Sequence, residues 1–116
     1  MEIGRIGTIG YGTGAQKKLE RELASRNIRL TTSEDADAWV LLPELKVADF
    51  ALVERLGKTD RPIFSVGTSP AISHYLTECH NWAGLLVLVE AYLFYKYQQR
   101  QRETMEVLYA RADAVA

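Results

Sequence analysis

The sequence predicts a small α/β domain: a mostly parallel, four-stranded sheet covered by helices in three layers, followed by a long C-terminal helix. Short continuous apolar runs, typical of buried strands, alternate with segments whose apolar residues recur every three or four positions, which is the helical period. Strands that alternate with helices favour a parallel sheet with helices on its faces. A chain of 116 residues is long enough for one core. We therefore expect a single domain, with its α/β core in residues 1–80 and the long helix in residues 82–112.

The first half of the chain contributes three predicted strands and one helix. Residues 3–10 are expected to form the first strand, because three isoleucines lie there. Residues 15–26 are expected to form a helix, since alanine and leucine recur every four residues and leave a charged face opposite. The helix ends near Asn27, a residue that tolerates the left-handed conformation. Further strands are expected at residues 28–32 and at residues 38–42, the latter a continuous apolar run of the kind that is buried on both faces.

The next segment predicts a strand between two helices. Residues 44–56 are expected to form a helix, with Pro43 before it and Gly57 in the position of a C-terminal cap. Residues 62–67 are expected to form the fourth strand. A short helix is expected over residues 69–80, because the Ser-Pro pair at its start matches an N-cap and a first helical residue.

The connection between the second and third strands is unusually short. Parallel neighbours usually need a crossover of a dozen or more residues, but only residues 33–37 lie between these strands. Five residues span at most about 17 Å, which is barely the length of a strand. Either the second strand is antiparallel or marginal, or a bare connection replaces the usual helix. We favour the lost helix.

Composition excludes several classes of function. The net charge of −1 gives no electrostatic footprint for duplex nucleic acid. The most apolar stretch, residues 82–97, falls short of the roughly 20 apolar residues of a membrane-spanning helix, so no membrane association is expected. No basic segment followed by an apolar core opens the chain, so no signal peptide is expected. The single cysteine, Cys79, excludes an internal disulfide and fits a reducing, cytoplasmic location.

Ligands in open α/β sheets bind at the carboxyl ends of the strands, and three predicted strand ends carry suitable residues. They are the segments 10–14, 42–44 and 67–69, each of which leads directly into a predicted helix. Backbone N–H groups at such helix starts suit an anion. The first segment matches the dinucleotide fingerprint G-x-G-x-x-A through Gly10, Gly12 and Ala15. In that fingerprint an acidic residue at the end of the second strand holds the ribose. Here Thr31 and Thr32 occupy that position, and the acidic residues Glu34 and Asp35 come a few positions further along the chain.

We expect these segments to form one phosphate-sized crevice. Gly10, Gly12, Thr13 and Gly14 are the residues expected to contact phosphate, and Tyr11 is placed to stack on a base. The second wall of the crevice is expected to consist of Gly67, Thr68 and Ser69. The alternative interpretation is that both segments are tight turns and helix caps that need no ligand.

Glu44 is the candidate catalytic carboxylate. It lies at a strand end, in the first turn of a predicted helix, where an acidic residue complements the helix dipole without further function. The sharper interpretation is a carboxylate that faces a ribose, or a nucleophile or base for cleavage of an N-glycosidic bond.

No metal site is expected. His74 and Glu78 share a predicted helical face, and Cys79 and His80 follow, but no second cluster supplies the remaining ligands of a closed zinc site. A buried small hydrophobe is the simpler role for Cys79. No G-x-S-x-G motif marks a hydrolase nucleophile.

The long helix is expected to start at about Trp82 and to end near Ala110. Its first half is apolar nearly all round, which is more than one sheet face would cover. This pattern predicts a homodimer through residues 82–112. The alternative is a helix that is simply folded into the monomer.

Two stretches resemble known nucleotide-binding families. Residues 35–67, DADAWVLLPE followed by a helix and RPIFSVG, resemble the second half of the Rossmann-like superfamily of lonely-guy phosphoribohydrolases, nucleoside deoxyribosyltransferases and their nucleotide-sensing relatives. Asp37, Pro43 and Pro62 match the family's positions, whereas residues 44–46 replace its Gly-Gly-x-Gly-Thr. The resemblance covers about a quarter of the chain and implies a small Rossmann-like domain.

The second resemblance lies at the end of the fourth predicted strand. Residues 64–70, FSVGTSP, are similar to the VGTS loop of the CRISPR-associated Rossmann-like domains, which bind cyclic oligoadenylates as dimers. In that family the loop follows the first strand, and in this chain it follows the last predicted strand. Both resemblances imply a nucleotide ligand at the strand ends.

The sequence thus favours a dimeric sensor or binding module for a nucleotide or another phosphate-bearing ligand. One alternative is an enzyme that cleaves an N-glycosidic or phosphodiester bond of a nucleotide. The other is a ligand-free interaction module that acts through its C-terminal helix.

Overall fold

The computed structural model describes residues 2–32, 34–67 and 71–115. Its elements are β1 (Gly4–Ile9), α1 (Thr13–Ala24), β2 (Ile28–Thr31), β3 (Ala38–Leu41), α2 (Val47–Gly57), β4 (Ile63–Val66), a 3₁₀ turn (Ser73–Tyr75), β5 (Thr77–Cys79) and α3 (Trp82–Val115). The strands form one sheet in the order β2-β1-β3-β4-β5, and all neighbouring strands are parallel. The predicted α/β class, with a parallel sheet and a long C-terminal helix, is confirmed. Over the residues that the structure describes, the sheet has five strands and not the predicted four.

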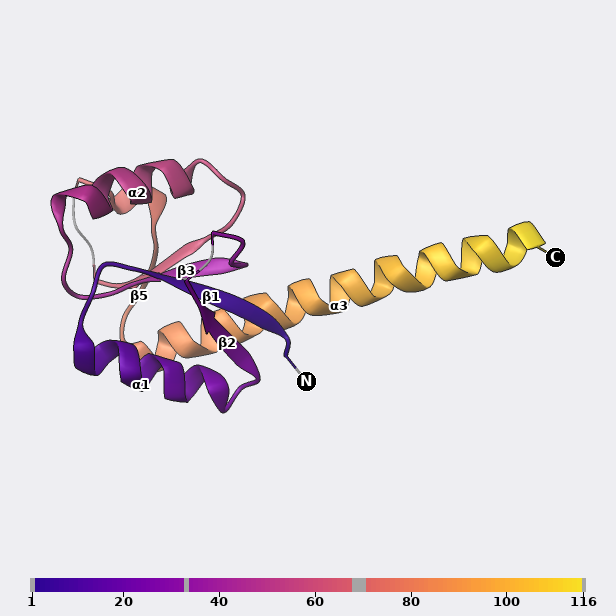
Figure 1. Ribbon diagram of the computed structural model, residues 1–116, viewed down its shortest axis with the longest axis horizontal. Helices are drawn as coiled ribbons and strands as arrows, with labels where there is room; N and C mark the ends of the chain where they lie inside the picture. Colours follow the sequence, from indigo (N-terminus) through magenta and orange to yellow (C-terminus); the bar gives the residue numbers. More distant parts are fainter. Residues whose placement is uncertain (1, 33, 68–70, 116) are drawn as a thin grey trace.

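The elements are arranged in three layers, as predicted. Figure 1 shows α2 on one side of the sheet and α1 with α3 on the other. Because side chains alternate between the faces of a strand, neighbouring residues serve different cores. Val40 and Phe64 belong to the core beneath α1 and α3, whereas Trp39 and Ile63 belong to the core beneath α2. The sheet therefore separates two apolar clusters.

The register of the strands explains how β2 connects to β3 without a helix. Thr31, at the end of β2, lies opposite Gly7 of β1, while Ala38, at the start of β3, lies opposite Ile6. The chain therefore only has to cross β1 sideways, about 10 Å at two interstrand spacings. It crosses on the α2 side, where Ala36 is buried and a Cβ on Gly7 would lie 3.3 Å from the Ala36 Cβ. The expected loss of the crossover helix is confirmed, and the antiparallel alternative for β2 is wrong.

The predicted short helix over residues 69–80 is wrong in the part of the chain that the structure describes. The start of that helix, Ser69 with Pro70, lies outside the described residues. Beyond it the chain forms the 3₁₀ turn and then β5, whose residues Thr77 and Cys79 lie opposite Phe64 and Val66 of β4. The conformation of this segment is therefore determined by its backbone pairing with the edge of β4. The helical pattern of its own residues does not determine it.

The helix α2 begins at Val47, later than the predicted start at Glu44. The backbone of Glu44 forms an isolated antiparallel bridge with Tyr11, which holds it outside the helix. At the other end, Gly57 is the last helical residue, and the cap that follows it is right-handed. A Cβ on Gly57 would lie 2.5 Å from Tyr75 Cδ1, so the glycine permits close packing and does not provide the predicted left-handed cap.

The helix α3 has two parts with different surroundings. We call residues 82–100 the anchored half, because they lie along the sheet and include Leu85, Val89 and Leu93, which are fully buried. We call residues 101–113 the projecting half, because all their side chains are exposed and the helix runs away from the domain (Figure 1). The molecule consequently measures 58 × 29 × 24 Å. In the described part of the chain, no helix has an apolar stretch long enough to cross a bilayer.

Candidate functional site

The loop that follows β1 is tied to the loop that follows β3. The N–H of Tyr11 donates to the carbonyl oxygen of Glu44 at 2.8 Å, and the N–H of Glu44 donates back to the carbonyl oxygen of Tyr11 at 3.0 Å. In a sheet with this strand order, the connection that leaves β1 crosses one face of the sheet and the connection that leaves β3 crosses the other. Ligands usually bind at the carboxyl edge between two such strands. The paired backbone closes that point directly, so any ligand at this edge has to lie beside the pair.

Two of the three loop glycines are explained by contacts within the chain. Gly10 has a φ of +85°, and a Cβ there would lie 2.5 Å from the Glu44 carbonyl oxygen. Gly12 is extended, and a Cβ there would lie 3.3 Å from Pro43 Cδ. Gly14 differs, since no atom of the described residues lies within 4 Å of its Cβ position. The first two glycines thus serve the fold, whereas Gly14 leaves open space at the start of α1.

The start of α1 offers unpaired backbone donors to that open space. Gly12 occupies the N-cap position, and no side chain caps the helix. The N–H groups of Thr13 and Gly14 have no acceptor among the described residues, and both residues are exposed. A helix start of this kind carries positive partial charge. The neighbouring loop adds Lys46, whose Nζ lies 5.8 Å from the centre of the Tyr11 ring. The edge therefore suits an anion.

An apolar hollow of about 350 Å³ lies at the carboxyl ends of β3 and β4. It is lined by Leu41, Leu42, Pro43, Leu45, Val66, Gly67 and Trp82. Gly67 has a φ of +81°, which favours glycine, and no atom of the other described residues lies within 4 Å of its Cβ position. The volume falls within the range of small-ligand pockets, and the side chains of the lining suit an apolar group.

A second hollow of about 210 Å³ lies between α1 and α3. Its lining residues are Gly14, Ala15, Lys18, Leu19, Glu22, Trp82 and Leu86. Trp82 lines both hollows. It therefore lies between the hollow at the ends of β3 and β4 and the first turn of α1. The sequence indicated neither Trp82 nor Lys46 as a site residue. For Trp82 the available signal was an aromatic residue at the predicted start of the long helix.

The structure brings only some of the predicted site residues together. Residues 10–14 and Gly67 lie at the same edge of the sheet, as expected, while residues 68 and 69 (Thr68 and Ser69) lie outside the described residues. Tyr11 is about half exposed. Glu44 is also exposed, and no described residue makes a hydrogen bond or an ion pair with its carboxylate. Its backbone is fixed by the bridge, but its side chain is not positioned against a partner.

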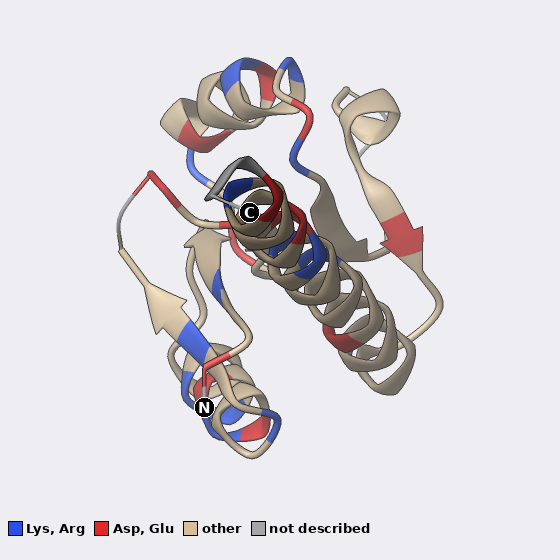
Figure 2. Cartoon of the chain, turned by 90° about the vertical axis from the view of Figure 1, so that its right-hand side faces the viewer, with Lys and Arg blue, Asp and Glu red and all other residues tan. Residues whose placement is uncertain are grey.

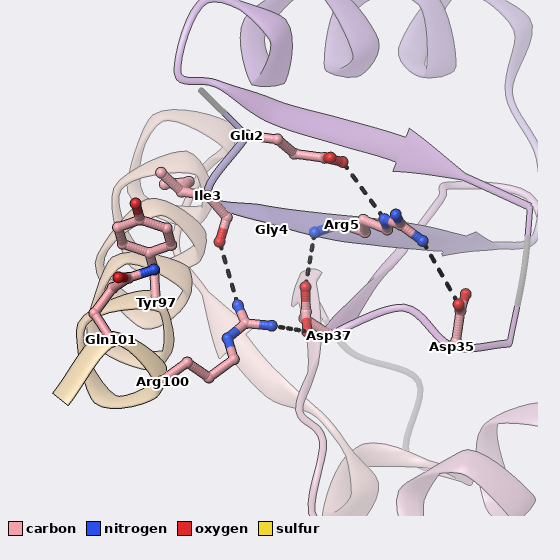
Figure 3. A pocket seen from close by; sticks show the side chains of 9 residues that line it. All are labelled: Glu2, Ile3, Gly4, Arg5, Asp35, Asp37, Tyr97, Arg100 and Gln101. Atoms are coloured by element: carbon pink, nitrogen blue, oxygen red, sulfur yellow. Dashed lines mark hydrogen bonds and ion pairs between the residues drawn. The ribbon is translucent and has the colours of Figure 1, made fainter. Parts of the chain in front are cut away.

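The opposite, amino edge of the sheet holds a polar hollow of about 380 Å³, shown in Figure 3. Asp37 lies at its centre: its Oδ2 accepts the N–H of Arg5 at 2.8 Å, and its Oδ1 lies 3.6 Å from Nη1 of Arg100. Arg5 also forms ion pairs with Glu2 at 3.5 Å and with Asp35 at 3.6 Å. The charged groups satisfy one another, and they join β1, the start of β3 and α3. We therefore assign this hollow a structural role.

The residues that suggested a metal do not assemble one. Within the described ranges, no three of His, Cys, Asp and Glu gather as a metal site would require. The ring of His74 lies against Tyr75, with centroids 3.9 Å apart. Cys79 is buried beneath α3, and burial raises the pKa of its thiol, which disfavours the reactive thiolate.

Comparison with protein-family models, with curated proteins and with solved structures finds no match. Function has to be inferred from the geometry of this chain alone.

Proposed function

We propose that this domain binds a phosphate-bearing ligand with a flat apolar group, of the nucleotide class, at the carboxyl edge of the sheet, and that it does so as a homodimer. One observation carries the ligand proposal. The unpaired N–H groups in the first turn of α1 lie at the same edge of the sheet as the apolar hollow at the ends of β3 and β4. Trp82 lines both this hollow and the one between α1 and α3. A nucleotide has the matching division into an anionic end and an aromatic end.

Each part of the edge has its own energetic role. The amides of Thr13 and Gly14, with the dipole of α1 behind them, favour the phosphate. Lys46 adds a full positive charge from the neighbouring loop. The apolar hollow favours a base or another ring, which gains by leaving water and by contact with the indole of Trp82.

A ligand screen tests the proposal. Thermal unfolding is followed with AMP, ATP, NAD, FMN, a cyclic dinucleotide and inorganic phosphate. A ligand at 100 times its Kd stabilises the folded state by about 2.7 kcal/mol, which raises the Tm of a domain of this size by several degrees. We expect at least one nucleotide to do so, and to exceed phosphate alone. The absence of a shift with every compound would contradict the proposal.

Two charge variants locate the binding edge. Lys46→Gln removes the exposed cation beside Tyr11, and we expect it to weaken binding about 10-fold, as for loss of one charged contact. The control is Lys58→Gln, which removes another exposed lysine that follows the far end of α2 and pairs with Glu54. Binding that responds equally to both changes would place the ligand elsewhere.

The geometry does not extend the proposal to catalysis. A general base or nucleophile has to be held against the reacting atom, and the exposed carboxylate of Glu44 has no partner in the described part of the chain. Chromatography of a stabilising ligand after incubation measures turnover directly. We expect the ligand to be recovered unchanged.

The homodimer proposal rests on α3. Its exposed large apolar side chains lie in both halves of the helix and include Val87, Leu88, Phe94, Tyr95, Met105, Leu108 and Tyr109. A solvent-exposed helix of about 13 residues is marginal on its own, and an apolar surface of this length marks an interaction site. Sedimentation at high protein concentration tests the proposal, and a monomer would contradict it.

A further inference from the structure

A line of side chains with the period of a coiled coil runs along the exposed face of α3. We call it the seam. Its members are separated alternately by four and three residues: Val87, Ala91, Phe94, Gln98, Gln101, Met105, Leu108 and Ala112. All eight are exposed. This spacing averages 3.5 residues, the repeat at which one helix packs along another.

The seam is separate from the face of α3 that packs on the sheet. Leu85, Val89 and Leu93 are fully buried in the core, whereas Val87 and Phe94 of the seam remain 64% and 47% exposed. The anchored half is therefore apolar on two sides, and only one of them is used within the chain. The seam also continues without interruption into the projecting half, whose side chains are all exposed.

The order of residues in the seam suits pairing with a second copy in the opposite direction. Its two central members are glutamines, and apolar residues lie on both sides of them. An antiparallel pair centred between these glutamines places polar opposite polar, and mostly larger opposite smaller. The four kinds of contact join Gln98 to Gln101, Phe94 to Met105, Ala91 to Leu108 and Val87 to Ala112, each across the two chains.

The residues beside the seam are complementary in the same arrangement. In an antiparallel pair, each flank of one helix faces the same flank of the other. Glu90, which pairs with Arg26 at 3.0 Å but stays half exposed, then faces Arg111 of the other copy. On the opposite flank, Tyr95 faces Arg102, an arrangement that allows a cation–π contact. A parallel pair would instead place Glu90 near Tyr95, and the match of opposite charges would be lost.

Figure 2, in which α3 runs toward the viewer, shows that the projecting half carries charges of both signs. Glu103, Glu106 and Asp113 accompany the two arginines that face the partner. Because charges of both signs occur along the helix, only some alignments of the two α3 helices place opposite charges next to each other.

A shallow apolar hollow beside the seam leaves room for the partner helix. It has a volume of about 640 Å³ and is bounded on the α3 side by Leu88, Ala91, Tyr92 and Tyr95 and on the sheet side by Phe64 and its neighbours. Leu88 lies on the flank that would face the exposed ring of Tyr109 from the other copy.

We propose that α3 pairs antiparallel with α3 of a second copy, so that each projecting half lies on the anchored half of its partner. This inference rests on the proposed homodimer and gives that dimer its arrangement. The two α/β domains then lie at opposite ends of a two-helix rod, each braced by the helix of the other.

Cross-linking distinguishes the two directions. In a Cys79→Ala background, Phe94→Cys and Met105→Cys are prepared separately and treated with a short bismaleimide, alone and after mixing. Identical positions lie 11 residues apart along an antiparallel pair, or about 16 Å at 1.5 Å per residue, so neither variant alone should form a cross-linked dimer. The mixture should form one. A parallel pair gives the reverse result, with efficient cross-linking of each single variant.

A matched pair of glutamates tests the seam itself. Leu108→Glu changes a seam residue, and Val107→Glu changes its neighbour on the outer side of the helix; both side chains are about half exposed and belong to the projecting half. We expect Leu108→Glu to raise the dimer Kd at least about 10-fold, while Val107→Glu leaves it within about 2-fold. Neither change should alter the Tm of the monomer, measured at a protein concentration below the dimer Kd, because neither side chain is part of a core cluster.

The outcomes separate this inference from the proposal beneath it. A monomer in sedimentation overturns both the dimer and its arrangement. A dimer in which each single cysteine variant cross-links, or in which the mixture does not, overturns only the antiparallel arrangement. The ligand screen is independent of all these results.

Discussion

The exchange of Gly10 for alanine tests whether the loop after β1 is held by the fold or by a ligand. Gly10 has a φ of +85°, where a residue with a Cβ is disfavoured by about 1–2 kcal/mol. The added Cβ would also lie 2.5 Å from the Glu44 carbonyl oxygen, a distance at which the backbone has to move. That oxygen accepts one of the two hydrogen bonds between Tyr11 and Glu44, and each such bond contributes about 1 kcal/mol. The sum is a loss of about 2–4 kcal/mol in the free energy of unfolding.

Gly14→Ala is the matched control, because it adds the same methyl group four residues later. No atom lies within 4 Å of that Cβ position, and Gly14 is already helical. Alanine in place of glycine in a helix is worth up to about 1 kcal/mol, so this variant should be neutral or slightly more stable. Its backbone N–H also remains available to an anion.

Equilibrium unfolding in urea measures both changes. With a slope of about 1–3 kcal/mol per molar urea, Gly10→Ala should lower the midpoint by about 1 M or more, while Gly14→Ala should leave it unchanged or raise it. Equal midpoints for the two variants would refute the reasoning, since they would show that the bridge between the two loops does not hold Gly10 in its left-handed conformation.

Two further predictions concern the amino edge and the alkaline range. Asp37→Ala should lower the free energy of unfolding by about 1–3 kcal/mol, because it leaves the N–H of Arg5 without its acceptor; Arg100→Ala should cost less than about 1 kcal/mol, since that ion pair is half exposed. Equal losses in urea unfolding would argue against this division. Burial raises the pKa of Cys79, and burial followed by the charges of two nearby aspartates raises the pKa of Tyr92. In the folded state the Cys79 thiol and the Tyr92 hydroxyl therefore lose their protons at a higher pH than in the unfolded state. Their contribution to the free energy of unfolding is complete below the ordinary pKa values of 9.0 and 10.0, and it decreases as the pH rises beyond these values. Unfolding measured from pH 7 to 11 should show this decline, and the double variant Cys79→Ala with Tyr92→Phe should flatten it; an unchanged slope would contradict the assignment.

The sequence was sufficient where local pattern and final environment agree. The continuous apolar run at residues 38–42 predicted a strand buried on both faces, and β3 is that strand. The first helix was expected to end near Asn27, a residue that tolerates the left-handed conformation, and its φ is +60°. The missing crossover helix could also be inferred, since too few residues lie between β2 and β3 for one to form.

Prediction failed where a distant segment determines the local structure. β5 has only three residues, and its conformation depends on pairing with β4, which no local signal in residues 77–79 announces. The late start of α2 has the same cause, because Glu44 pairs with Tyr11 from another loop.

The sequence placed the glycine loops at the carboxyl edge of the sheet, and Gly10, Gly12, Gly14 and Gly67 do lie at that edge. Their role in binding a ligand stays a prediction. Lys46 and Trp82 could not be assigned to the site, because their proximity to the edge depends on where α2 and α3 begin in space. The interaction of Asp37 with Arg100 was equally hidden, since a long stretch of chain separates them.

The staggered register between β2 and β3 also affects the order in which the sheet can form. Three of the five strands lie between Gly4 and Leu41, and they are adjacent in the sheet. Closing a short loop costs less entropy than closing a long one, and folding is fastest where contacts are local in sequence. The β2-β1-β3 half of the sheet can therefore assemble before β4 and β5 are added at one edge. The long helix packs on β4 and β5, so it is held in place only after that addition. The surface that we propose to join two copies therefore becomes available last, when each domain is already complete.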